Sequence, residues 1–272
     1  SEGCSPLVLQ TVVENTVAAG IVVVVSAGNS GSDCFTVDDP PAIYAASLTV
    51  GATTSLDGIA SFSSRGPVTV DGSGRRKPDA CAPGVLVRSS YPVNTYATMS
   101  GTSMAAPHVA GLVALILEAR PDFRGDVEEI RSLVELSAVP LTSSQDCGGI
   151  SGLDVPNNTF GHGRVDALGS LTGDSDGDGT ANLAACRPVD AAVWSVPSPA
   201  TGLAVGGLST LSWQPPDQPG AVAWTYDLLR STAAGDFSTA ECVAAGTGGT
   251  EATDPALPAP VLYCLVRGNN GC

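Results

Sequence analysis

The segment Gly101-Thr102-Ser103-Met104-Ala105-Ala106-Pro107-His108-Val109-Ala110-Gly111 decides the fold predicted for this chain. It places Ser103 between a glycine turn and a predicted helix at residues 105–119, which carries no charge before Glu118. A helix of this composition is expected to be buried on all sides. Since a helix N-terminus favours negative charge, the Ser103 hydroxyl is a candidate nucleophile that faces a cleft. A serine that caps a buried helix is the alternative.

The segments around this helix predict an α/β domain. The β-branched run at residues 21–25 is typical of a strand buried on both faces of a parallel sheet. A helix is predicted at residues 5–19, with Ser5 as its cap and Pro6 at its first position. Further patterns predict strands at 47–53, 59–63 and 85–90 and an amphipathic helix at 126–137. Helices that alternate with apolar strands favour a parallel sheet.

The composition changes after residue 171, which predicts three parts. Residues 1–171 form the α/β domain, 172–200 an acidic linker, and 201–272 a β module. Apolar and polar residues alternate at 208–213, 222–230 and 261–267, which predicts an antiparallel β-sandwich. Trp213 and Tyr226 are expected in its core.

Charge and cysteine content exclude several classes of function. The net charge of −15 argues against a nucleic-acid partner, because phosphate binding needs a basic face. The uncharged stretch at 89–117 contains Pro, His and Asn, so no membrane span is predicted. Eight Cys without a CxxC pair, and two distant His, argue against zinc and favour disulfides in a secreted protein. We expect pairing within each part, with Cys242 joined to Cys272.

Several segments together resemble the subtilisin-like serine proteases, the subtilases. Residues 101–111 resemble the family's nucleophile motif over eleven consecutive positions, with Ser103 as the nucleophile. The run from Val24 to Gly31 resembles the strand end of the oxyanion hole, with Asn29 as the side-chain donor. Residues 61–67, 77–84 and 161–167 resemble further landmarks, so the resemblance covers about residues 1–170. It implies a serine endopeptidase that cleaves proteins or peptides through an acyl-enzyme.

The catalytic base is absent from the expected place in the sequence. The family's order is Asp, His, Ser, yet no His precedes Ser103. His108 belongs to the nucleophile motif and is expected to be a core residue, and His162 lies in a glycine-rich loop. The chain is therefore expected to be the C-terminal part of the catalytic domain, with a partial parallel sheet, inactive without a missing N-terminal half. The alternative is a non-catalytic scaffold or binding protein derived from a subtilase.

The resemblance also implies a pocket for the residue before the scissile bond. Its wall corresponds to Ser26, Ala27 and Gly28, and Asp39 falls near its base. A carboxylate there would favour Lys or Arg side chains. A solvent-facing turn at Asp39 is the alternative. The family's loop after the oxyanion asparagine carries a cis proline, so Pro41 is expected to be cis.

An acidic repeat in the linker predicts a calcium site, although no cofactor is expected for catalysis. Asp174, Asp176 and Asp178 stand at alternating positions before a glycine, as at the start of a calcium loop. The Thr180 carbonyl and the Asn182 side chain could add ligands. The segment resembles a degenerate thrombospondin type 3 repeat, and residues 201–272 resemble a fibronectin type III module. An acidic, solvated linker is the alternative.

Overall fold

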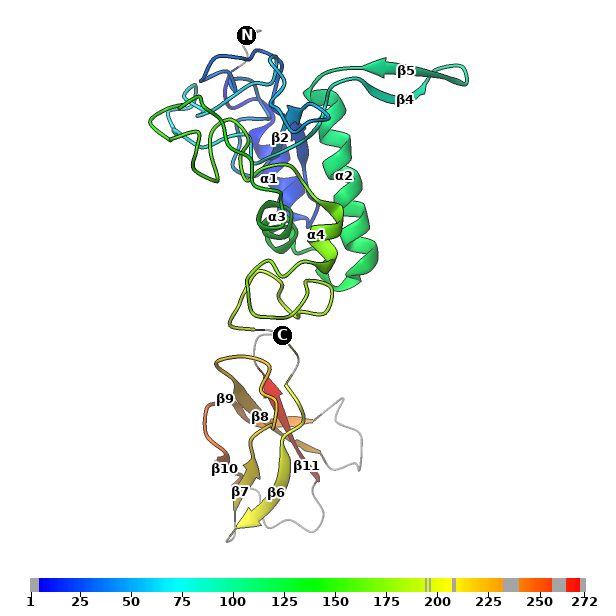
Figure 1. Cartoon of the computed structure of the whole chain (residues 1–272). Helices are drawn as coiled ribbons and strands as arrows, with labels where there is room; N and C mark the ends of the chain where they lie inside the picture. The colour runs from blue at the N-terminus through cyan, green and yellow to red at the C-terminus, as the bar shows by residue number, and fades with distance from the viewer. Residues whose placement is uncertain are drawn as a thin grey trace. The chain divides into compact units, whose positions relative to one another are not determined.

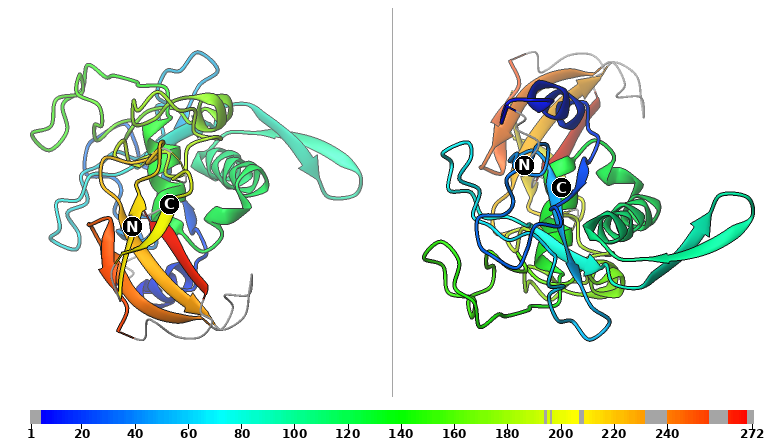
Figure 2. Two further views of the ribbon diagram at one scale, coloured as in Figure 1. Left: turned by 90° about the horizontal axis from the view of Figure 1, so that it is seen from below. Right: turned by 90° about the horizontal axis from the view of Figure 1, so that it is seen from above.

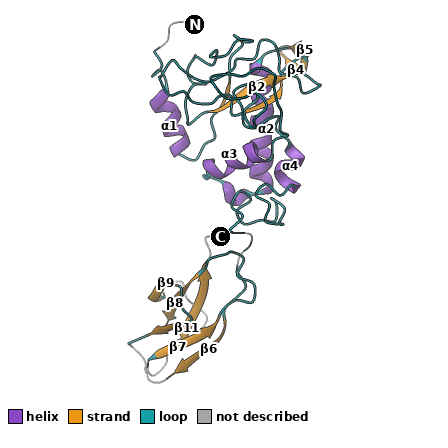
Figure 3. Cartoon of the chain, turned by 60° about the vertical axis from the view of Figure 1, so that its left-hand side comes forward, coloured by secondary structure: helices purple, strands orange, loops and turns teal. Residues whose placement is uncertain are grey.

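A computed structural model of the chain describes residues 5–193, 195, 197–206, 209–231, 240–255 and 263–269. The chain divides into two compact units, Ser1–Ser175 and Asp176–Cys272. The first unit is a mixed α/β structure with long loops, and the second contains antiparallel strands (Figures 1 and 3).

A parallel sheet with the order β1-β2-β3 forms the centre of the first unit. The strands are β1 (Val24–Ser26), β2 (Leu48–Thr53) and β3 (Ala80–Pro83). Every residue of β2 is buried, because it has a neighbour on each side. β1 is only half-buried and lies at the sheet's edge in the described part of the chain. The predicted strand at 21–25, buried on both faces, is therefore wrong in length and in burial.

The long helix α2 (Thr102–Ala119) packs against all three strands. Its buried face comprises Thr102, Ala105, Val109, Leu112, Val113 and Ile116. The prediction of burial on all sides is wrong, because Leu115 on another face is 54% exposed. The length and composition of α2 would also suit a membrane span, as they do for many core helices. Its packing against the sheet accounts for the apolar face.

The other helices of the first unit are α1 (Gln10–Ala18), the 3-10 turn η1 (Pro121–Phe123), α3 (Val127–Leu136) and α4 (Ala167–Thr172). α1 begins later than predicted, and Ser5 does not cap it: its Oγ accepts from the Leu7 amide within a preceding turn. α3 agrees with the prediction, and the Asp126 side chain caps it by accepting from the Glu129 amide. The predicted strand at 59–63 is wrong, because it is a single bridge at Ile59 followed by turns.

Strands β4 (Val87–Tyr91) and β5 (Thr95–Met99) form a hairpin that projects from the first unit (Figures 1 and 2). Both strands are largely exposed. The Arg88 guanidinium lies 4.1 Å from the Tyr96 ring centroid. A two-stranded ribbon of this kind has little core of its own and depends on contacts outside it.

The second unit contains two three-stranded antiparallel sheets, which agree with the predicted β module. Their orders are β10-β7-β6 and β11-β8-β9. The strands are β6 (Thr201–Gly206), β7 (Thr210–Gln214), β8 (Thr225–Ser231), β9 (Glu241–Thr247), β10 (Glu251–Thr253) and β11 (Tyr263–Asn269). Trp213 and Tyr226 are core residues as predicted, and their rings meet edge to face at 5.4 Å.

The cysteines depart in part from the expected pairing. Cys34 and Cys147 form a disulfide within the first unit, and Cys186 is also disulfide-bonded. Cys242 is a free, exposed thiol on β9, so its expected link to Cys272 is wrong; Cys272 itself lies outside the described residues. Cys81 is free inside β3, where burial raises the pKa of its thiol to about 12. Cys81 therefore behaves as a core residue.

Candidate active site

Ser103 is the second residue of α2 and is exposed at the edge where the sheet strands end. The turn before it is tied to the end of β3, because the Gly101 amide donates to the Gly84 carbonyl at 2.8 Å. The carboxyl ends of parallel strands commonly form binding sites. The helix N-terminus thus presents the Ser103 hydroxyl at this edge.

Asn29 lies three residues beyond the end of β1 and is joined directly to the turn before Ser103. Its Oδ1 accepts from the Thr102 amide at 2.9 Å and from the Thr102 hydroxyl at 3.1 Å. These two bonds fix the amide plane and leave Nδ2 as a donor, for which no acceptor is found within the described part of the chain. The structure therefore brings together two motifs that are 73 residues apart.

Thr102 is a site residue that sequence reasoning did not single out. Besides its bonds to Asn29, its Oγ1 lies 3.3 Å from the Gly28 amide, which donates to it. Thr102 is fully buried, so these bonds are shielded from water. The available signal was its place beside Ser103 in the motif, where a hydroxyl can serve as donor and acceptor at once.

Ser64 supports the turn that carries Asn29. Its amide donates to the Gly28 carbonyl at 3.0 Å, and its Oγ accepts from the Ser30 amide at 3.1 Å. Gly28 has φ +104°, and a Cβ at that position would lie 2.8 Å from the Ser64 Oγ. A side chain at Gly28 would therefore displace the turn. These contacts give Ser64, one of the landmark residues at 61–67, a structural role.

A groove of about 300 Å³ lies between the start of α2 and β4. Its lining residues are Val87, Arg88, Ser89, Ser103, Met104, Pro107 and His108. His108 is exposed, which corrects the expectation of a core histidine. Its Nδ1 lies 2.9 Å from the Met104 carbonyl. Five residues along a helix turn the side-chain direction by about 140°, so His108 is not directed at Ser103.

His162, the second histidine of the chain, belongs to a charged cluster on α3 and the start of β3. Its Nε2 lies 3.4 Å from a Glu135 carboxylate oxygen. Asp79 accepts from the Lys77 ammonium at 2.5 Å and from the Thr49 amide at 2.6 Å. Asp79 precedes β3 whereas Ser103 follows the strands' far ends. The cluster therefore lies at the opposite end of the sheet from Ser103.

The predicted pocket residues do not line this groove. Ala27 is buried, and its amide donates to the Val50 carbonyl at 2.9 Å, so Ser26 and Ala27 continue the pairing of β1 with β2. Gly28 begins the turn that carries Asn29, and its amide donates to the Thr102 hydroxyl. Asp39 is exposed, and its backbone carbonyl accepts from the Ala42 amide. The Pro40–Pro41 peptide bond is cis, as predicted.

Three acidic side chains of the linker converge. Ligand oxygens of Asp174, Asp176 and Asp178 all lie within 4.8 Å of one another. Asp178 Oδ2 is buried without a hydrogen-bond partner, whereas Oδ1 accepts from the Thr180 amide at 2.6 Å. Asn182, four residues after Asp178, is buried. Such a set of hard oxygen donors fits a calcium ion, which would offset the repulsion between the carboxylates.

Comparisons with known proteins agree with the sequence motifs. Residues 1–163 match the subtilase family (peptidase S8). Subtilisin of Bacillus pumilus is 42% identical over 137 residues, which are 50% of this chain and 46% of that protein. Serine protease AprX of Bacillus subtilis is 39% identical over 182 residues, 59% of this chain and 37% of its own length. The chain thus covers less than half of either relative.

The fold also resembles a solved structure, that of the prenylagaramide maturation protease PagA. The TM-score is 0.50 at 22% identity, over 62% of this chain and 56% of that one. At this identity the likeness concerns the fold. It is consistent with a subtilisin-like α/β domain and an appended β module.

Proposed function

The chain belongs to the subtilase family, and on this premise we propose that it carries the nucleophile part of a serine endopeptidase acting on proteins or peptides. Ser103 is the proposed nucleophile and Asn29 the proposed oxyanion donor. The observation that carries the proposal is the pair of hydrogen bonds that Thr102 donates to Asn29 Oδ1. They orient the Asn29 side-chain amide close to Ser103.

The proposed reaction follows from this arrangement. A histidine base takes the proton from Ser103 Oγ, which attacks the scissile carbonyl. The Ser103 amide and Asn29 Nδ2 donate to the resulting oxyanion. Collapse of the tetrahedral intermediate expels the amine, which receives the proton from the histidine. Water then hydrolyses the acyl-enzyme by the reverse sequence.

The base and its orienting carboxylate come, in this proposal, from an N-terminal half that joins this chain. Three features support such a partner. β1 has no neighbour on its outer edge in the described part of the chain. Ile21 and Leu115 are 56% and 54% exposed. An apolar pocket of about 360 Å³ lies between residues 20–22, α2 and the start of α3. Large apolar surfaces of this kind usually mark an interface.

Peptide hydrolysis by an extended protein that contains the upstream Asp and His tests the proposal. Ser103→Ala should abolish turnover. Asn29→Gly should lower kcat by about 10²–10³-fold, the loss known for the corresponding asparagine of subtilisin, with little change in KM. Asn94→Gly, in the exposed turn of the hairpin, is the matched control and should leave both constants unchanged. Wild-type kcat in Asn29→Gly would remove Asn29 from the mechanism.

The proposed substrate pocket has Ser26, Ala27 and Gly28 as its wall and Asp39 at its base. The assignment of Asp39 rests on its place in the loop that follows Asn29. A carboxylate there would bind a Lys or Arg side chain of the substrate and disfavour an acidic one.

Calcium is a proposed structural ligand of the linker. Asp174, Asp176 and Asp178 would hold it with carboxylate oxygens, helped by the Thr180 carbonyl and the Asn182 side chain. The convergence of the three carboxylates and the unsatisfied Asp178 Oδ2 support this assignment. The ion would neutralise the charge and order the loop, and it takes no part in peptide hydrolysis.

We also propose a secreted location and a fibronectin type III-like role for the second unit, as a spacer or weak binding module. The Cys34–Cys147 disulfide supports an oxidising compartment. Two packed three-stranded antiparallel sheets around Trp213 support the module assignment.

A further inference from the structure

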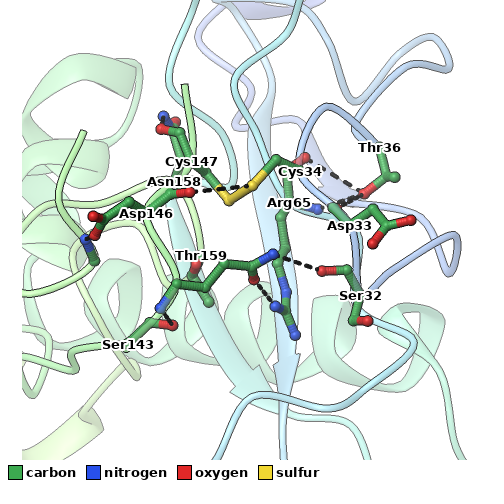
Figure 4. Close-up of a disulfide and its surroundings, with 12 residues drawn as sticks. Ser32, Asp33, Cys34, Thr36, Arg65, Ser143, Asp146, Cys147, Asn158 and Thr159 are labelled. Carbon is green, nitrogen blue, oxygen red and sulfur yellow. Dashed lines mark hydrogen bonds between the residues drawn. A yellow bond between two sulfur atoms is a disulfide. The ribbon is translucent and has the colours of Figure 1, made fainter. Parts of the chain in front are cut away.

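A disulfide joins the loop after Asn29 to a distant segment of the first unit. We name residues 30–39 the pocket loop, because they connect Asn29 to Asp39, and residues 143–152 the anchor segment. Cys34 of the pocket loop is bonded to Cys147 of the anchor segment, 113 residues further along the chain (Figure 4).

Polar contacts accompany the disulfide on both sides. The Gln145 side-chain amide donates to the Ser32 carbonyl at 3.1 Å, and its oxygen accepts from the Arg65 guanidinium. The Cys34 sulfur also lies 3.5 Å from the Asp146 carbonyl. The anchor segment thus contacts the pocket loop through three consecutive residues, Gln145, Asp146 and Cys147.

Arg65 links these contacts to the middle of the pocket loop. Its carbonyl accepts from the Thr36 amide at 2.8 Å, and its own amide donates to the Thr36 hydroxyl at 2.9 Å. The next residue, Val37, is completely buried. One residue therefore fixes the loop through its backbone and reaches the anchor segment through its side chain.

The anchor segment is itself closed by internal hydrogen bonds. The Ser143 amide donates to the Gly152 carbonyl at 2.7 Å, and the Gly152 amide donates to Asp146 Oδ1 at 2.8 Å. The buried Asn158 side chain donates to the Cys147 carbonyl at 3.0 Å. The segment can therefore act as a fixed point for the loop that it contacts.

We propose that the anchor segment is a positioning element of the substrate pocket: through Cys34–Cys147 and Gln145 it fixes the pocket loop and thereby Asp39. This inference rests on the proposed function. A pocket loop that must be ordered when substrate binds weakens binding, because the lost conformational freedom is subtracted from the affinity. The anchor segment acts on substrate affinity and leaves the bond-making step at Ser103 unchanged.

Hydrogen exchange on the present chain tests the positioning directly. In Cys34→Ala/Cys147→Ala the amides of Phe35, Thr36 and Val37 should exchange faster, whereas those of β2 should keep the wild-type rate. Cys242→Ala, which removes a free thiol in the second unit, is the control and should change neither. Unchanged exchange at these three amides, or equal acceleration in β2, would overturn the proposal.

Kinetics of the extended protein separate positioning from a purely structural role. Cys34→Ala/Cys147→Ala should raise KM for Arg-containing peptides about tenfold, the effect of ordering one or two further side chains on binding, with kcat within about twofold. Gln145→Ala should have a smaller effect in the same direction. A fall in kcat at constant KM would contradict positioning. If the wild-type extended protein fails to cleave peptides, the proposed function fails, whereas the exchange experiment still decides the anchoring.

Discussion

Thr102 shows how a single side chain organises the candidate site. Its amide and hydroxyl both donate to Asn29 Oδ1, and its hydroxyl accepts from the Gly28 amide. A buried hydroxyl with these partners holds the Asn29 amide in one orientation before substrate binds. Preorganised donors of this kind lower the barrier because they need no reorganisation as the oxyanion forms.

Asp39 carries the prediction on specificity. In the extended protein, Asp39→Ala should lower kcat/KM for Arg-containing peptides and leave Leu-containing peptides nearly unchanged, because only a cationic side chain uses the carboxylate. Parallel assays on the two peptide series measure the ratio of kcat/KM for Arg-containing peptides to kcat/KM for Leu-containing peptides. Asp38→Ala, one residue earlier, is the control and should leave the Arg-to-Leu ratio as in the wild type. An unchanged ratio in Asp39→Ala would leave Asp39 without a role in the pocket.

Glu135 carries the prediction on pH. Burial, together with the nearby Asp79 carboxylate, raises the pKa of Glu135 from 4.5 to about 7. The folded chain thus retains a proton that the unfolded chain has already released. The free energy of unfolding should therefore fall as pH rises from about 4.5 to 7, by at most about 3 kcal/mol.

Urea unfolding at a series of pH values measures this effect. Glu135→Gln should remove the fall, so that this variant is more stable than wild type at pH 8 and comparable at pH 4. Glu128→Gln, on the same helix with a 79% exposed side chain, is the control and should follow the wild-type curve. A Glu135→Gln curve parallel to the wild type would show that the carboxyl titrates normally.

The site residues were predictable only where the chemistry is carried by a motif. Ser103 and Asn29, which the motifs single out, lie close to each other at one edge of the sheet, and their roles stay a prediction. Thr102 lies within the same motif, but its role could not be predicted from it, because that role depends on contact with Asn29, 73 residues away in the sequence. His108 was expected in the core because it belongs to a helix that was expected to be buried on all sides, but it lies on the open face of that helix.

At the scale of elements, α2 has one face against the sheet and one face open. Leu112 is 3% exposed and Leu115 is 54% exposed, although they are only three residues apart. Leu112→Ala should destabilise the chain by about 2–5 kcal/mol through cavity formation. Leu115→Lys should change the free energy of unfolding by less than about 0.5 kcal/mol.

Gel filtration and the binding of a hydrophobic dye test whether the open apolar face of α2 is exposed in solution. The isolated wild-type chain should self-associate or bind the dye through its open apolar face, and Leu115→Lys should reduce both. Equal destabilisation by the two substitutions would show that Leu115 is buried in solution. A compact wild-type monomer without dye binding would show that this face needs no partner.

Element types followed from periodicity more reliably than element ends and burial did. The pattern predicted β2 and α3 well, because β2 is a short run rich in β-branched residues and α3 has an acidic cap. It overestimated the length and the burial of β1, because burial on both sides would require a neighbouring strand on each side. It also overestimated α1, where Ser5 forms a local turn in place of a cap.

At the scale of the whole molecule, the linker between the two units should respond to calcium. Calcium should raise the melting temperature of the present chain, because an ion bound only to the folded state stabilises it. Differential scanning calorimetry with calcium and then with a chelator measures the shift. Asp176→Asn/Asp178→Asn should abolish it, and the control Asp217→Asn should not. A wild-type melting temperature that is unaffected by calcium would leave the cluster as a solvated acidic segment.

Fluorophosphonate labelling of Ser103 tests the central claim most directly, since the reagent reports a nucleophile activated by a base. The account predicts no labelling of the isolated chain at neutral pH, and one label per molecule, at Ser103, in the protein extended by the upstream Asp and His. Ser103→Ala in the extended protein should remain unlabelled. Stoichiometric labelling of the isolated chain would contradict the account by placing the base within these residues, and an unlabelled extended protein would contradict it by favouring a non-catalytic scaffold.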